Sequence, residues 1–113
     1  MEDSVNVEKK GDIAIVRCAG QIDSNSYYAL KDGLKKLVEE GIFRIVVDFS
    51  SATFVSSAGW GTIIGNLIAT RNKRGDIVVT GLSGGVKHVY ETAQFDELIK
   101  SCDTIEDAIK FFS

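Results

Sequence analysis

Apolar and polar residues along this chain follow two periods, one of about two residues and one of three to four. The period of two, together with runs rich in β-branched residues, predicts strands. The period of three to four predicts amphipathic helices. Ile45, Val46 and Val47 are consecutive and apolar, which is typical of a central strand covered on both faces. The predicted strands are 5–8, 13–19, 44–49 and 77–80.

Each predicted helix carries an apolar stripe that we expect to face the core. Gly41 and Gly75 end the first two helices, Leu98 and Ile99 predict a brief extended piece, and Thr104 predicts an N-cap for the last helix. The stripes are Leu30, Leu34, Leu37 and Val38; Trp60, Ile63, Ile64, Leu67 and Ile68; Val86, Val89, Tyr90 and Ala93; and Ile105, Ala108, Ile109 and Phe112.

Strands that alternate with helices predict an α/β fold with a mostly parallel central sheet and about four helices. The opening hairpin predicts an antiparallel N-terminal edge strand, and residues 1–113 are expected to form a single domain. Function in such sheets collects at the carboxyl ends of the strands. Three loops, 20–26, 50–59 and 81–85, are expected to meet there.

Composition excludes several classes of function. The 113 residues have a net charge of −3 and no long basic run, so we expect no direct nucleic-acid binding. The polar start argues against a signal peptide, and no apolar run reaches the length of a membrane span, which favours a cytoplasmic protein. Two cysteines and one histidine make no metal cluster, and Cys18 is expected to be a buried small hydrophobe.

The loops carry hydroxyls and carboxylates but no histidine. A serine nucleophile needs a partner that takes its proton, and His88 lies one turn into a later helix, so we expect neither an enzyme nor a cofactor. Asp48 resembles a phospho-accepting aspartate, but Asp23 stands alone where that site needs an acidic pair, and no lysine follows Thr80. Asp48 is therefore expected to close an apolar strand and to bind loop N–H groups.

Two glycine-bearing stretches are candidate anion sites. Gly59-Trp60-Gly61 lacks the later glycine of a dinucleotide motif. Residues 81–85 form either an anion-binding nest, which would suit a nucleotide, or a strand-to-helix turn eased by glycine, which we favour.

Ser56 and Ser57 lie where a strand passes into a helix. Either hydroxyl can cap the helix or carry a phosphate, because N–H groups at a helix N-terminus lack partners and favour negative charge. A phosphate adds about −1.5 to −2 charges. Beside Asp23, and Asp48 on a neighbouring loop, it would build an acidic cluster that repels a partner without altering the fold.

Four elements of the chain, in order, resemble the STAS domain family and within it the bacterial anti-sigma factor antagonists. Gly20-Gln21-Ile22-Asp23 resembles the family's Gly-x-Leu/Ile-Asp element, and Val47-Asp48-Phe49-Ser50 its Asp-Leu-Ser/Thr strand end. Residues 54–59, Phe-Val-Ser-Ser-Ala-Gly, resemble its signature loop, and Glu106-Asp107-Ala108 its C-terminal helix. The resemblance covers nearly the whole chain.

The resemblance implies a function and a site. The unphosphorylated protein would bind an anti-sigma factor that is a serine kinase and so release a sigma factor, and phosphorylation of Ser57 would end this binding. Ser56 stands where the family often has Asp, which makes it the alternative phosphorylation site, and Trp60 stands where Leu is common. The expected partner-binding residues are Asp23, Ser24, Asn25, Val55, Ser56, Ser57 and Trp60.

Some alternatives stay open at this point. Trp60 belongs either to the core or to an interface, and Ser57 is either phosphorylated or a plain N-cap. A homodimer is possible from sequence alone. The other candidate functions are a non-switching STAS adaptor subunit of a sensory or transport assembly and a nucleotide binder on the loop 81–85.

Overall fold

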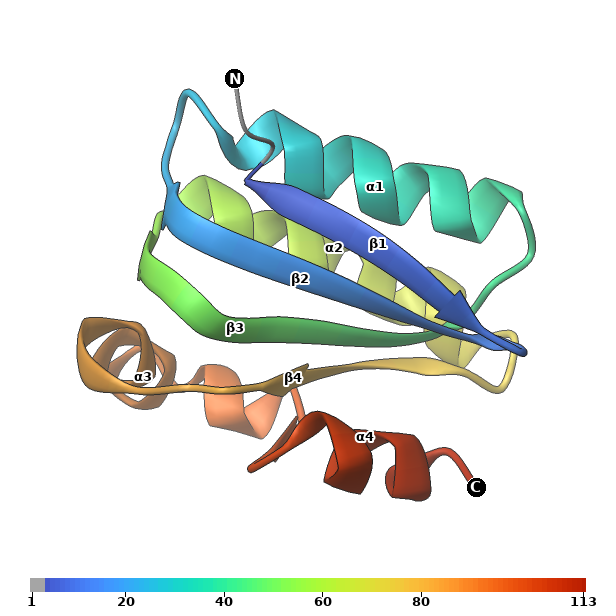
Figure 1. Cartoon of the computed structure of the whole chain (residues 1–113). Coiled ribbons are helices and arrows are strands. Elements are labelled where there is room, and N and C mark those ends of the chain that lie inside the picture. Colours follow the sequence, from blue (N-terminus) through green and yellow to red (C-terminus); the bar gives the residue numbers. More distant parts are fainter. Residues whose placement is uncertain (1–3) are drawn as a thin grey trace.

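Five strands form one mixed sheet, with the strand order β1-β2-β3-β4-β5 (Figure 1). The computed structural model describes residues 4–113. β1 pairs antiparallel with β2, and all other neighbours are parallel, as the alternation of strands and helices predicts. The strands are β1 (Val5–Lys10), β2 (Ile13–Ile22), β3 (Arg44–Val55), β4 (Asp76–Thr80) and β5 (Ser101–Cys102).

The helices cover both faces of this sheet. α1 and α2 pack on one face, α4 packs on the other, and α3 lies beyond the end of β4 (Figure 1). The predicted α/β fold with four helices is therefore confirmed. The helices are α1 (Tyr27–Glu39), α2 (Ser57–Arg71), α3 (Gly84–Thr92) and α4 (Ile105–Phe111), with a 3-10 turn at Phe95–Glu97.

The continuous apolar run of β3 is buried on both faces. Ile45 and Val47 join the large cluster under α1 and α2, and Val46 joins the smaller cluster under α4. Cys18 is 1% exposed and also lies in the large cluster, which confirms it as a buried hydrophobe. Burial, and after it the charge of Asp48, raises the pKa of the Cys18 thiol to about 12.

Three strands continue further than the sequence pattern predicts, and β1 does so only by two residues, to Lys10. β2 ends at Ile22 rather than at residue 19, and β3 ends at Val55 rather than at Phe49. The extensions of β2 and β3 pair with each other, from Ala19 opposite Ser51 to Ile22 opposite Val55. The register shifts between Arg17 and Ala19 and between Gly20 and Gln21, and at each shift β3 has one residue more than β2. Apart from the core residues Ile22 and Val55, this part of the sheet is largely exposed, so polar residues are compatible with strand pairing there.

Three sequence-based predictions are wrong: two concern buried side chains on helices, and one concerns a short strand after α3. Ile68 is 75% exposed and Thr70 is buried instead, and Val89 and Ala93 are exposed although the stripe placed them inside. Leu98 and Ile99 follow the 3-10 turn and form no strand. The N-cap at Thr104 is confirmed, because its Oγ1 accepts a hydrogen bond from the Asp107 N–H at 3.1 Å.

Candidate functional site

The two serines at the start of α2 have different roles. Ser56 is the N-cap: its backbone is extended, and its Oγ accepts a hydrogen bond from the Gly59 N–H at 3.3 Å. Ser57 is the first helical residue and is exposed. A plain capping role for Ser57 is therefore wrong. The cap belongs to its neighbour, which leaves the Ser57 hydroxyl at the positive end of the helix dipole.

Gly59 lets the first turn of α2 press against the ends of β2 and β3. A Cβ atom at this position would lie 2.9 Å from Val55 Cγ1 and 3.2 Å from Ile22 Cγ2, closer than side chains pack. The Ser56 N–H also donates to the Ile22 carbonyl at 2.7 Å. The turn that contains Ser57 is thus held by packing at Gly59 and by the hydrogen bond at Ser56.

Asp23 follows Ile22 and lies in the loop beside the serine turn. Its Oδ1 accepts hydrogen bonds from the N–H groups of Asn25 at 2.9 Å and Ser26 at 3.0 Å. The Asn25 N–H, followed by the hydroxyl and N–H of Ser26, holds the pKa of Asp23 below its ordinary value by stabilising the carboxylate. Asp23 orders this loop, and the exposed Ser24 and Asn25 form its surface.

Two of the expected partner contacts, Val55 and Trp60, are wrong because both side chains are buried. Val55 is 4% exposed and Trp60 is 1% exposed, so both belong to the core and present no surface to a partner in this conformation. The Trp60 ring packs against Phe49, Tyr90 and Phe95, with ring centroids 5.2–5.8 Å apart.

Asp48 is separate from the serine turn. It lies within β3 rather than on a loop, and seven further strand residues, about 20 Å of extended chain, follow it before α2 begins. Its carboxylate accepts hydrogen bonds from the N–H of Ser50 at 3.2 Å and from the hydroxyl of Thr80 at 3.1 Å. Asp48 binds a nearby N–H as expected, but it does not close the strand, because β3 continues to Val55. Its expected contribution to an acidic cluster at Ser57 is also wrong.

The glycine turn after β4 is explained by packing. Gly81 has a φ of +70°, and a Cβ atom there would lie 2.6 Å from the Ser50 nitrogen and 2.7 Å from Asp48 Oδ1. Both the backbone conformation and the close approach require glycine. This supports the strand-to-helix turn over the anion-binding nest.

A hollow beside Ser57 is a feature that the sequence analysis missed. It lies between α1 and α2 and has a volume of about 420 Å³. A Cβ atom at Gly61 or Gly65 would meet nothing within 4 Å, so neither glycine is needed for packing. Two glycines four residues apart in a helix were the available signal. The hollow is lined by Tyr27, Lys31, Ala58, Gly61, Thr62, Gly65 and Asn66.

Two other kinds of site, a metal site and a membrane-spanning helix, are absent from the part of the chain that the structure describes. No group of three or more His, Cys, Asp or Glu residues within 4–113 is placed to hold a metal ion. None of the helices described for this range is long and apolar enough to cross a membrane. The single histidine, His88, lies exposed on α3.

The chain is similar in sequence and in fold to several known proteins. The chain is 26% identical over 94 residues to the anti-sigma-B factor antagonist of Listeria monocytogenes, and the match covers 82% of each chain. An anti-sigma factor antagonist from Mycobacterium paratuberculosis has a similar structure, with a TM-score of 0.82, 21% identity and coverage of 96% of this chain and 92% of that chain.

The phosphorylated form of the Bacillus cell fate determinant SpoIIAA is also similar, with a TM-score of 0.74 and 17% identity over 96% of this chain and 99% of that chain. A family model for the STAS domain matches residues 4–108, nearly all of the described chain. The chain therefore belongs to the STAS domain family.

Proposed function

We propose that this protein is an anti-sigma factor antagonist switched by phosphorylation of Ser57. In the unphosphorylated form it binds an anti-sigma factor that is also a serine kinase, and a sigma factor is released. Phosphorylation of Ser57 by this partner ends the binding. The protein acts in the cytoplasm as a binding partner and as a kinase substrate, not as an enzyme.

The observation that carries the proposal is the division of roles between the two serines. Because Ser56 caps α2, Ser57 is exposed and a kinase can modify it without removing a capping bond. A phosphate at the first helical residue would be stabilised by the helix dipole and by nearby N–H groups. The fold would therefore tolerate the added charge while the surface changes.

The surroundings of Ser57 suggest how the charge would act on a partner. The Asp23 carboxylate lies on the adjoining loop, so a phosphate would place two acidic groups next to the exposed Ser24 and Asn25. The hollow between α1 and α2 begins at Ala58, next to the phosphorylated residue. A partner side chain seated in that hollow would meet the phosphate directly. The proposal is also supported by the antagonist names of the relatives and by a phosphorylated structural neighbour.

The test is a kinase assay with a serine-kinase anti-sigma factor from the same genome, ATP and mass spectrometry. The wild type and Ser56→Ala should gain one phosphate, whereas Ser57→Ala should gain none. Ser57→Asp should lose binding to the same partner in a pull-down. Phosphate on Ser57→Ala but not on Ser56→Ala would assign the switch to Ser56.

A constitutive adaptor would give a different result. It would stay in complex with its partner through incubation with kinase and ATP, and Ser57→Asp would elute with that partner in size-exclusion chromatography. That outcome would remove the switch while leaving the family assignment intact.

A further inference from the structure

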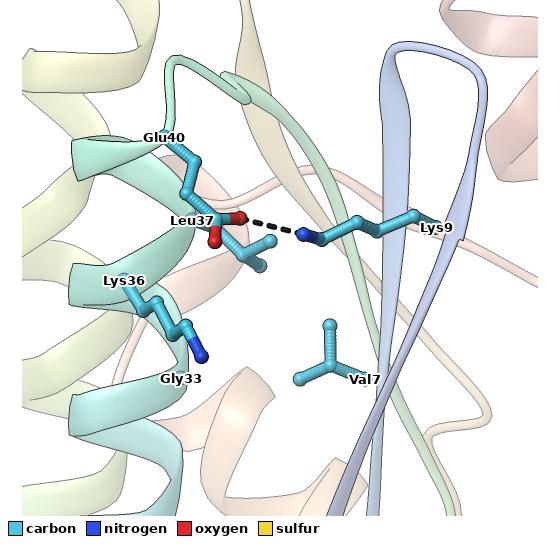
Figure 2. A pocket seen from close by; sticks show the side chains of 6 residues that line it. All are labelled: Val7, Lys9, Gly33, Lys36, Leu37 and Glu40. Carbon is cyan, nitrogen blue, oxygen red and sulfur yellow. Dashed lines mark hydrogen bonds and ion pairs between the residues drawn. The ribbon is translucent and has the colours of Figure 1, made fainter.

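A second hollow lies between β1 and α1, away from the serine turn. Its volume is about 270 Å³, and it is lined by Val7, Lys9, Gly33, Lys36, Leu37 and Glu40 (Figure 2). Lys9 Nζ and Glu40 Oε1 are 2.7 Å apart and join the strand to the helix on one side of it. Figure 2 shows the Lys36 amine directed into the space in front of Val7.

Gly33 keeps this hollow open without a packing reason. A Cβ atom at Gly33 would lie 3.7 Å from Val7 Cγ2 and 4.0 Å from Val5 Cγ1, which is ordinary van der Waals contact. Glycine inside a helix lowers stability by about 0.5–1 kcal/mol relative to alanine. Because Gly33 has no side chain, the space above Val7 stays open, and the Val7 side chain is 40% exposed.

The rim of the hollow has one uncompensated positive charge. Glu40 is paired with Lys9, and the Lys9 ammonium, with a smaller contribution from Lys36, holds the pKa of Glu40 below its ordinary value. Lys36 has no ion-pair partner among residues 4–113. The floor is apolar, formed by Val7 and by Leu37, which is 2% exposed. An apolar floor below a free ammonium group matches a ligand with an apolar body and one anionic end.

We propose that this hollow binds a small amphiphilic carboxylate. The apolar body lies over Val7 and Leu37 in the space left by Gly33, and the carboxylate pairs with Lys36. This site is independent of the Ser57 switch, because it involves β1 and the C-terminal half of α1 rather than α2.

Octanoate is the probe, titrated into the full chain labelled with ¹⁵N and followed by amide chemical shifts. Saturable shifts are expected at Val7, Lys9, Gly33, Lys36 and Leu37. Lys36→Gln should weaken binding by about 3- to 5-fold, the range of a partly exposed ion pair. Lys35→Gln removes the same charge from the next, exposed position of α1 and should leave the affinity unchanged.

Gly33→Ala distinguishes a loss of octanoate binding at the hollow from a loss caused by unfolding. Alanine should raise the thermal midpoint of unfolding, because it favours the helix, while its methyl group occupies the hollow and weakens octanoate binding. Octanol, which lacks the carboxylate, should bind more weakly than octanoate. The proposal is overturned if octanoate gives no saturable shifts at these residues, if octanol binds equally well, if Lys35→Gln matches Lys36→Gln, or if Gly33→Ala binds octanoate as the wild type does.

Discussion

The two halves of β3 have opposite surroundings in one continuous strand. From Arg44 to Phe49 the strand lies between β2 and β4 and is covered by helices on both faces. From Ser50 to Val55 it pairs with β2 alone and is mostly exposed. The inner half lies in the core on both faces, and the outer half leads to the serine turn, where Val55 is buried but Ser57 is exposed. The contrast indicates that the proposed switch can change its surface chemistry with little effect on stability.

The largest expected effect comes from placing one charge in each half. Val47→Asp buries a carboxylate at a position that is 0% exposed, without a cation beside it in the apolar cluster. It should reduce the free energy of unfolding by at least about 4 kcal/mol. Thr53→Asp, at an exposed position of the outer half, should change it by less than about 0.5 kcal/mol. Urea denaturation of both variants measures this, and similar losses would contradict the contrast.

The glycines of α2 sharpen the contrast at the point where the outer half ends. Gly59→Ala should lower stability by about 1–3 kcal/mol, because its methyl group would overlap Val55 and Ile22. Gly61→Ala, two residues on, faces open space and should raise stability by about 0.5–1 kcal/mol. Thermal unfolding of the pair should therefore show shifts of opposite sign. Gly61→Ala should also weaken binding of the proposed partner by filling the hollow next to Ser57.

Substituting Ser56 or Ser57 is expected to give a smaller difference in the free energy of unfolding. Ser56→Ala removes the N-cap of α2 and should lower stability by about 1 kcal/mol. Ser57→Ala removes an exposed hydroxyl and should be neutral within about 0.5 kcal/mol. Chemical denaturation compares them directly. Equal losses would mean that Ser57 has a structural role and would count against a switch at this position.

The smallest effect concerns the pH dependence of the loop beside the outer half. The pKa of Asp23 is lowered in the folded state, so its contribution to stability is present above the unfolded value of about 4 and is lost as the pH falls through the folded value. Asp23→Asn should therefore lose less stability on acidification below about pH 4 than the wild type. Exposed Asp32→Asn is the control and should keep the acid dependence of the wild type.

Sequence patterns were sufficient for the inner part of the molecule. The run Ile45–Val47 predicted a strand buried on both faces, and Cys18 and Thr104 took the predicted roles. The patterns failed where burial does not follow a simple period. The outer half of β3 is polar although it is a strand, and Ile68 is exposed although it lies on an apolar stripe.

The candidate site was also only partly predictable. The predicted parallel sheet placed Asp23 and Ser57 on neighbouring loops, and the hydrogen bond from the Ser56 N–H to the Ile22 carbonyl brings these two loops side by side. Sequence alone left open which serine caps the helix and whether Trp60 is buried. Both answers depend on where α2 begins relative to the end of β3, and this depends on strand pairing between distant residues.

The sequence by itself determined the α/β class, the order of the elements and the family, because local periodicity and short motifs are properties of neighbouring residues. Only the tertiary structure decided that Ser56 caps α2, that Val55 and Trp60 are core residues, that Asp48 lies far from the serine turn, and that hollows flank α1. These are outcomes of packing between segments far apart in the chain. Burial, close approach and empty space arise only when such segments meet.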